Sequence, residues 1–289
     1  MRPGKARRSP QGQRYDREIL YLALPALGAL AAEPTYVLVD TAIVGHLGTP
    51  QLAALAIAAT LLSTGLTLFN FLTYGTTAQV ARLHGAGERA AAGRLAAQAL
   101  WLAVGLGGAL FAAVLLLAPP AVGLMGGAGE VGEMAVTYLR ISALGLPFAM
   151  VALAGQGFLR GVGNLRRPLV ILVSANAANV VLELLFVYGF GWGIAGSAWG
   201  TVLAQAGMGA AFVYELLRAS GGASRRPRPG AMRPLLKVGG DIAVRTGALL
   251  ASFALASAVV ARMGRRRSRP IRSPSSSSSS SRWCSTPSP

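Results

Sequence analysis

Long apolar stretches separated by short polar connections restrict how this chain can fold more than any other feature. Each stretch is long enough to cross the hydrocarbon core of a bilayer as a helix. Seven recur along the 289 residues, at about 19–45, 51–83, 93–118, 133–159, 168–190, 193–218 and 238–263. Only 13% of the residues are charged, well below the usual share in soluble domains. The sequence therefore predicts an all-α polytopic membrane protein.

Among the tail and connections up to residue 237, only alternate ones contain arginine and lysine. There are six in 2–17, three in 82–94, three in 160–167 and six in 218–237, and none in 46–51, 118–134 or 188–196. This is the positive-inside pattern, which predicts a multi-pass protein with a cytoplasmic N-terminus. We expect its location to be the plasma membrane. Helix orientation thus explains the net charge of +17, and we expect no nucleic-acid partner.

Two carboxylates fall inside the first apolar stretch. Glu33, Tyr36 and Asp40 lie at i, i+3 and i+7, so they share one face of a helix. A carboxylate at membrane depth is costly and by default marks an ion or substrate path. The alternative is an acid near a helix end that reaches headgroups or water, which fits Asp40 better than Glu33 because Gly45 and Gly48 follow it closely. We place this face on an internal cavity and expect a functional role for Asp40 before Glu33.

Further polar side chains at membrane depth occur in two later stretches. They are Ser174, Asn176, Asn179 and Glu183 in 168–190, and Ser197, Thr201 and Gln205 in 193–218. Asn179 and Glu183 are one helical turn apart and share a face. A structural hydrogen-bond network between helices is the alternative to a functional site, and a threonine can also bond back to its own helix. Gly196 and Gly200 suit close packing of helices.

Four of these residues together offer oxygen ligands for a hard cation such as sodium: Asp40, Asn179, Glu183 and Thr201. A surrounding of low dielectric disfavours the charged form of the acids, which could therefore carry protons instead. The residues leave the choice between H+ and Na+ open. We expect no cofactor and no enzyme activity, because His46 and His84 stand apart from each other and from the single cysteine, Cys284.

The segment 264–289 departs from the pattern of the rest of the chain. It is basic and rich in serine and proline, and it contains no further apolar stretch. Such low-complexity tracts do not pack into a core. After seven spans its arginines would lie on the outer face, against the charge pattern of the earlier connections. Either it is a genuine disordered tail, or it is a frameshifted translation of a gene that continued into more helices, which is our preferred interpretation.

Five segments identify a family when taken together. They are REILYLALPALG (17–28), VDTAIVGHLGTPQLAALAIA (39–58), ARLHGAGE (81–88), GFLRGVGNLRRP (157–168) and GWGIAGSAWGT (191–201). They resemble the multidrug and toxic compound extrusion (MATE) transporters, in the DinF-like branch, over about residues 17–263. The resemblance implies twelve helices in two six-helix lobes around a V-shaped chamber. It also implies export of cationic or amphipathic compounds driven by inward movement of sodium ions or protons.

The resemblance also implies roles for particular residues. Asp40, Asn179, Glu183 and Thr201 would form the cation site of the N-terminal lobe, and Tyr36 and Gln156 would line the chamber and contact substrate. Glu33, on the face that Tyr36 and Asp40 share, is a further substrate contact that we expect from its place at membrane depth. The family usually has aspartate at the position of Glu183, so the longer side chain here alters the expected geometry of the ligands.

The expected organisation follows from this comparison. It comprises a disordered basic tail (1–17), a six-helix lobe (18–219), a cytoplasmic linker (220–235), a seventh helix that opens a second lobe (236–263) and the low-complexity segment (264–289). Because alternating access needs two lobes, we expect the product to be inactive unless it pairs with another lobe. The other expected partners are small cationic or amphipathic molecules and membrane lipids. The alternatives are a non-transporting membrane scaffold or regulatory half-transporter, and a lipid flippase of the same superfamily.

Overall fold

The computed structural model describes residues 10–220 and parts of the region after them, at 230, 232, 239–241, 244–249, 251–252 and 255–256. The chain divides into two compact units, Met1–Arg245 and Thr246–Pro289. Every described residue beyond 220, in either unit, is helical. Most of the predicted linker (220–235) and seventh helix (236–263), and all of the low-complexity segment (264–289), lie outside the described residues.

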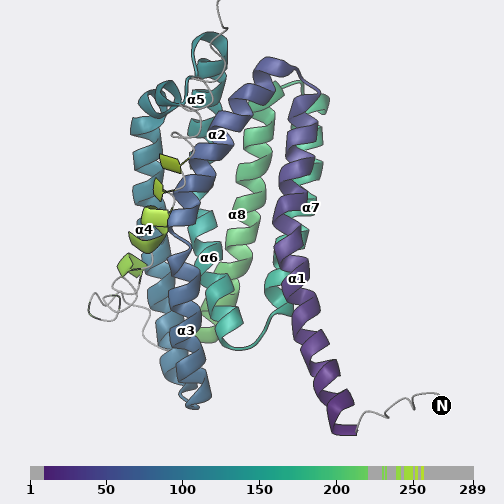
Figure 1. Cartoon of the computed structure of the whole chain (residues 1–289), viewed down its shortest axis with the longest axis vertical. Coiled ribbons are helices and arrows are strands. Elements are labelled where there is room, and N and C mark those ends of the chain that lie inside the picture. The colour runs from purple at the N-terminus through teal and green to yellow at the C-terminus, as the bar shows by residue number, and fades with distance from the viewer. Residues whose placement is uncertain are drawn as a thin grey trace, which may run out of the picture. The chain divides into compact units, whose positions relative to one another are not determined.

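Helices account for nearly all of residues 10–220, which contain no strand (Figure 1). In chain order they are α1 (Pro10–Gly45), α2 (Thr49–Leu68), α3 (Phe71–Gly85), α4 (Arg89–Leu124), α5 (Gly129–Ala143), α6 (Leu146–Gly161), α7 (Arg166–Leu184), the π-helical turn η1 (Leu185–Gly189) and α8 (Gly193–Ser220). The prediction of an all-α fold is therefore confirmed.

Two of the predicted single helices are broken in the structure. The stretch expected at 51–83 consists of α2 and α3, which are separated at Phe69 and Asn70. The stretch expected at 133–159 consists of α5 and α6, whose axes differ by 52°. Pro147 explains the second break, because it has no N–H to donate to the carbonyl of Ala143. Asn70 is a weak helix former whose side chain competes for backbone hydrogen bonds. Both stretches stay apolar across these breaks, and for this reason each was predicted as a single helix.

The first helix begins earlier than predicted. It starts at Pro10 rather than near Ile19, so the residues 10–17 of the predicted disordered tail are helical, and residues 1–9 lie outside the described part. Proline is favoured in the first helical position, where its missing N–H would have no partner in any case.

Several helices can cross a membrane by length and composition. In the described part they are Thr49–Gly85, Arg89–Leu124 and Arg166–Gly189, with the bent pair α5–α6 as a fourth if it counts as one span. The other two predicted spans of this region lie in α1 and α8, helices of 36 and 28 residues, and stay predictions.

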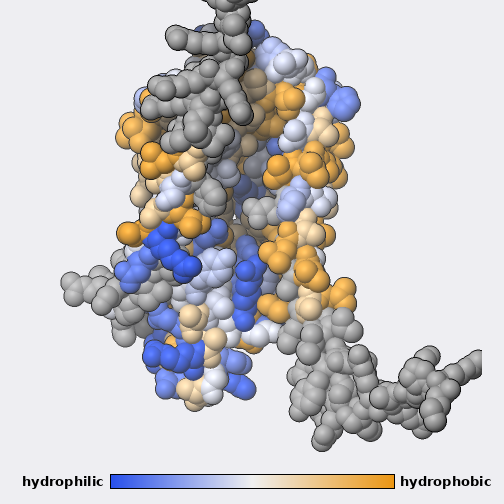
Figure 2. Space-filling model, in the orientation of Figure 1, coloured by the Kyte–Doolittle hydropathy of each residue, from blue (hydrophilic) through white to orange (hydrophobic). Residues whose placement is uncertain are grey.

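The connections between helices lie alternately at the two ends of the first unit (Figure 1). Those that follow α1, α4 and η1 lie at one end, and those that follow α3 and α6 lie at the other. The second end carries the basic residues that flank these connections, Arg82, Arg89, Arg160, Arg166 and Arg167. Figure 2 shows hydrophilic residues gathered toward this lower end and hydrophobic residues over much of the upper part of the same face. The alternation of charge in the sequence thus corresponds to a separation in space.

Two clusters of buried apolar side chains hold the helices together. One lies among α3, α4, α6 and α8 and includes Leu72, Met150 and Phe212. The other joins the end of α1 to α2, α5 and the start of α8, and includes Val44 and Leu139. The helix α8 contributes to both clusters and packs against α5, α6 and α7. It therefore carries the side chains of its polar face into the interior.

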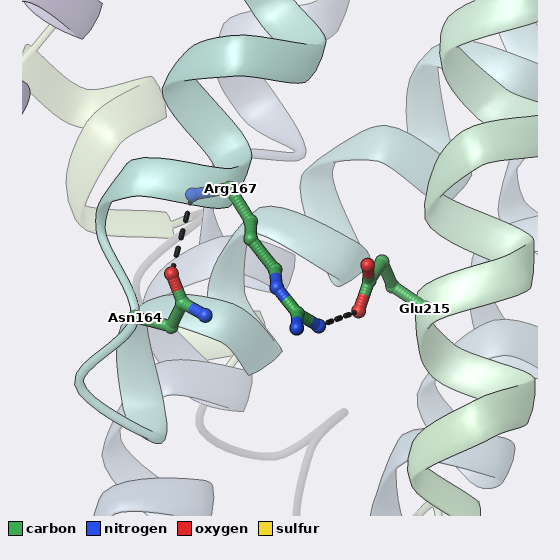
Figure 3. Close-up of polar contacts among 3 residues, drawn as sticks. All are labelled: Asn164, Arg167 and Glu215. Atoms are coloured by element: carbon green, nitrogen blue, oxygen red, sulfur yellow. Dashed lines mark hydrogen bonds and ion pairs between the residues drawn. The ribbon is translucent and has the colours of Figure 1, made fainter.

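A polar contact fastens the start of α7 to α8 (Figure 3). The side-chain oxygen of Asn164 accepts a hydrogen bond from the backbone N–H of Arg167 at 3.2 Å. Arg167 in turn donates from Nη1 to Oε2 of Glu215 at 2.7 Å. The Arg167 side chain is 47% exposed, so water and salt screen this ion pair.

The variant Glu215→Gln is expected to lower the free energy of unfolding by less than about 1 kcal/mol, because exposed ion pairs contribute little. Asn164→Ala removes the bond that caps the first turn of α7 and is expected to have an effect of about 1 kcal/mol. Thermal unfolding of the purified variants in detergent measures both effects. A loss of several kcal/mol in Glu215→Gln would mean that this contact is a principal fastening of the lobe.

Candidate cation site and cavity

Asp40 is enclosed by protein near the end of α1. Its side chain is 7% exposed. Ser197 of α8 donates a hydrogen bond from Oγ to Oδ1 of Asp40 at 3.1 Å. The two residues are 157 positions apart in the sequence, so the carboxylate lies where α1 and α8 meet. Asp40 therefore faces the interior of the helical bundle rather than lipid headgroups.

Thr201 of α8 links its own helix to α1 and α7. Its Oγ1 accepts a hydrogen bond from Nδ2 of Asn179 on α7 at 3.2 Å. The hydroxyl of Tyr36 on α1 lies 3.4 Å from the same oxygen. Asn179 is 2% exposed, so this contact is closed to lipid. Thr201 therefore contacts side chains of α1 and α7. The sequence had left open a hydrogen bond from Thr201 to the backbone of its own helix.

Glu183 is fully buried in the last turn of α7. It lies close to Ser197 and to Asp40, whose carboxylate interacts with it electrostatically. Both of its carboxylate oxygens, and Oδ1 of Asn179, lack a hydrogen-bond partner in the described part of the chain. No described residue forms an ion pair with Glu183 or Asp40. The structure therefore brings together all four of the residues that were predicted to bind a cation.

This arrangement restricts what the site can do chemically. A buried acceptor that has no donor is unfavourable by about 1–3 kcal/mol, and more when it is charged. Two neighbouring carboxyl groups without a basic partner can share a proton, or they can bind a cation together. Carboxylate, amide and hydroxyl oxygens are the ligands of hard cations. The residues present thus fit either ion.

A cavity of about 520 Å³ lies beside the four residues. Its wall comes from α1, α2, α3, α5, α6, α7 and α8, and it includes Asp40, Asn179 and Thr201. Glu183 does not line the cavity and lies behind this wall. The volume is within the range of small-molecule sites, about 300–1,000 Å³. An ion that enters from the cavity meets Asp40 before it reaches Glu183.

The predicted substrate contacts are only partly described. Tyr36 and Gln156 line the cavity. Oε1 of Gln156 accepts a hydrogen bond at 3.2 Å from Arg160, which lines the cavity too. Glu33 lies within α1, but its side chain is outside the described residues.

The sequence did not single out two residues that belong to the site. Ser197 was noted only for its spacing with Thr201, and its contact with Asp40 depends on how α1 packs against α8. Tyr138 on α5 is 4% exposed and lines the cavity. Ser142, one turn after Tyr138, also lines the cavity. This spacing of four residues on α5 is the one signal that could have indicated a polar face there.

The predicted close packing of glycines is confirmed beside the site. A Cβ added to Gly196 would lie 2.8 Å from the carbonyl carbon of Phe186 in η1. A Cβ added to Gly200 would lie 3.1 Å from the backbone nitrogen of Glu183. The backbone of α8 therefore packs directly against that of α7 and η1. This contact positions Glu183 beside Ser197 and Thr201.

The chain matches known proteins over most of its length. A family model described as MatE matches residues 25–185. The chain is 34% identical over 260 residues to DNA damage-inducible protein F of Escherichia coli, covering 86% of this chain and 56% of that protein. It is 33% identical over 264 residues to Protein DETOXIFICATION 44, chloroplastic, of Arabidopsis thaliana, covering 86% and 50%. The chain thus spans about half the length of the curated relatives it matches.

Solved structures match to a similar extent. A transporter of the MOP superfamily from Pyrococcus furiosus superposes with a TM-score of 0.71 at 26% identity, covering 78% of this chain and 51% of that one. A MATE structure in the straight conformation gives a TM-score of 0.73 at 25% identity, covering 84% and 56%.

Proposed function

The chain belongs to the MatE family of integral membrane transporters, and on that premise we propose that it couples inward movement of a sodium ion or proton to the export of cationic or amphipathic compounds. The coupling ion binds at Asp40, Asn179, Glu183 and Thr201. The exported compound binds in the cavity beside them.

One observation carries the ion assignment: the buried acceptors of Glu183 and Asn179 have no donor in the described structure. Most buried polar atoms in proteins have a hydrogen-bond partner, because an unpaired one is unfavourable, and an ionisable residue at membrane depth by default marks a functional site. The neighbouring carboxylate of Asp40 adds negative charge, and no described basic residue pairs with it. A sodium ion or proton would satisfy these oxygens and neutralise the charge.

The position of Asp40 suggests how ion and cargo exclude each other. Asp40 belongs both to the cavity wall and to the acidic site. With the ion absent, its charge attracts a cationic compound into the cavity. With the ion bound, that attraction is lost, and α1 can move toward α7 and α8. Pro25 and Pro34 lie within α1, and prolines in membrane helices allow bending. The compound and the ion therefore alternate.

The cavity lining favours an amphipathic compound. Most of the lining is apolar, with leucine, alanine and Met208 around it. Tyr36, Gln156 and Gln205 supply a few hydrogen-bonding groups among these apolar side chains. An apolar pocket with few polar groups orients a ligand without demanding one particular structure.

Alternating access in such transporters involves two lobes that move against each other around a central site. The relatives that this chain matches are about twice as long as the matched region. We therefore propose that the lobe described here works with a second lobe, supplied by the same polypeptide or by another one.

The purified chain in lipid nanodiscs is expected to bind a saturating amount of radioactive sodium, or to take up a proton on acidification that sodium does not displace. Everted membrane vesicles that contain the chain together with a second lobe are then expected to transport a fluorescent cationic dye under the corresponding ion gradient. The two measurements together distinguish the coupling ions. If the folded chain neither binds sodium nor takes up a proton, the proposal fails. Ion binding without dye transport would favour a regulatory half-transporter.

A further inference from the structure

The π-helical turn η1 begins two residues after Glu183. Its backbone follows an i→i+5 pattern, in which the N–H of Phe190 donates to the carbonyl of Leu185 at 2.9 Å. Turns of this kind are rare and occur often at functional sites. In this wide turn, residues five apart face the same side, so Tyr188 faces α1 as Glu183 does.

Tyr188 makes a hydrogen bond to the last turn of α1. Its hydroxyl donates to the carbonyl oxygen of Ile43 at 2.8 Å. Ile43 lies three residues after Asp40. The last carbonyls of a helix lack N–H partners within it. The N–H of Leu47, which would continue the helical pattern, donates instead to Val44 at 3.0 Å. Tyr188 therefore supplies the partner that Ile43 would otherwise lack.

The turn that carries Tyr188 is itself firmly held. The rings of Phe186, Phe190 and Trp192 lie 5.2–5.7 Å apart between centroids. The N–H of Trp192 donates to the carbonyl of Phe186 at 3.0 Å. Gly196 of α8 packs against the backbone of the same turn. Tyr188 therefore hydrogen-bonds to α1 from a turn that packs against α8.

We propose that Tyr188 is a positioning residue for the cation site: its bond to Ile43 holds the last turn of α1 so that Asp40 stays beside Glu183 and Ser197. This inference rests on the proposed function, because it concerns how tightly the ion is bound. Tyr188 does not line the cavity and hydrogen-bonds to none of the four proposed ligands. Its effect therefore passes through the backbone of α1.

The variant Tyr188→Phe tests the inference because it removes only the hydroxyl. The Tyr188 side chain is 50% exposed, so the ring itself remains accommodated. We expect ion affinity to fall by about threefold to tenfold, the usual net effect of one hydrogen bond. The shift in Tm that the ion produces in wild type should shrink accordingly. Tyr214→Phe is the matched control, since Tyr214 is 63% exposed on α8 and lies outside the cavity wall.

The measurements separate this inference from the function on which it rests. Absence of sodium binding and proton uptake in wild type would overturn the proposed function, and the positioning role with it. Wild-type binding with equal affinity in Tyr188→Phe would overturn the positioning role alone. A variant with a lower Tm without ion but an unchanged ion-induced shift would show that the bond is purely structural, which also overturns it. Weaker ion binding in Tyr188→Phe, with Tyr214→Phe unchanged, supports it.

Discussion

Replacing Asp40 with asparagine is expected to abolish ion binding and ion-coupled export. Asparagine keeps nearly the same shape and an oxygen that can still accept the bond from Ser197. The change therefore removes the charge of Asp40 and leaves the packing of α1 against α8 intact. Sodium binding, or proton uptake where the proton is the coupling ion, measures the loss in the purified variant.

The expected size of the effect follows from the burial of the site. Removing one partner of a buried, charge-paired group is unfavourable by about 3–5 kcal/mol. At about 1.4 kcal/mol for each factor of ten, this weakens ion binding by more than a hundredfold. Screening by water would reduce the effect at an exposed site, but Asp40 is 7% exposed and Glu183 is fully buried.

Glu183→Gln distinguishes the two roles proposed for Asp40, which are binding of the ion and attraction of the cationic compound. Because Glu183 does not line the cavity, its replacement should weaken ion binding while leaving binding of a cationic compound nearly unchanged. Asp40→Asn should weaken both. Glu215→Gln is the matched control, since it removes a carboxylate from the same lobe outside the cavity wall. Wild-type ion affinity in folded Asp40→Asn protein would contradict the assignment of Asp40.

The features that were predictable from sequence are those that local composition determines. Helix positions follow from the lengths of the apolar stretches, and their alternation follows from the placement of arginine and lysine. The polar residues of the site stand out because each lies among apolar neighbours. For this reason Asp40, Asn179, Glu183 and Thr201 could be grouped before their contacts were known.

The features that were missed depend on contacts between distant segments. The break between α5 and α6 leaves the apolar pattern unchanged, although Pro147 lies beside it. The π-helical turn has no distinctive composition, and the bond from Tyr188 joins residues 145 positions apart. Ser197 reaches Asp40 across a similar separation. Such pairings require knowledge of which helices are neighbours, and periodicity does not supply it.

Gly196→Ala is expected to destabilise the lobe and to disturb its ion site together. The added Cβ would lie 2.8 Å from the carbonyl carbon and 2.9 Å from the carbonyl oxygen of Phe186. Both atoms belong to the backbone, so no side-chain rotation relieves the contact, and α8 must move away from η1. Overpacking of this kind is unfavourable by about 1–3 kcal/mol. In a protein of this size each kcal/mol lowers Tm by about 2–4 °C.

Gly207→Ala provides the control on the same helix, because no atom lies within 4 Å of its added Cβ. Alanine is favoured over glycine in a helix by about 1 kcal/mol, so this variant should be as stable as wild type or slightly more stable. Measuring ion binding shows whether the added methyl group disturbs the cation site as well as the stability, because Gly196 directly precedes Ser197, which donates a hydrogen bond to Asp40. Displacement of α8 should therefore weaken ion binding even in the fraction of Gly196→Ala protein that remains folded. Ion affinity and Tm equal to those of Gly207→Ala would show that α8 and η1 can separate without affecting the acids between them.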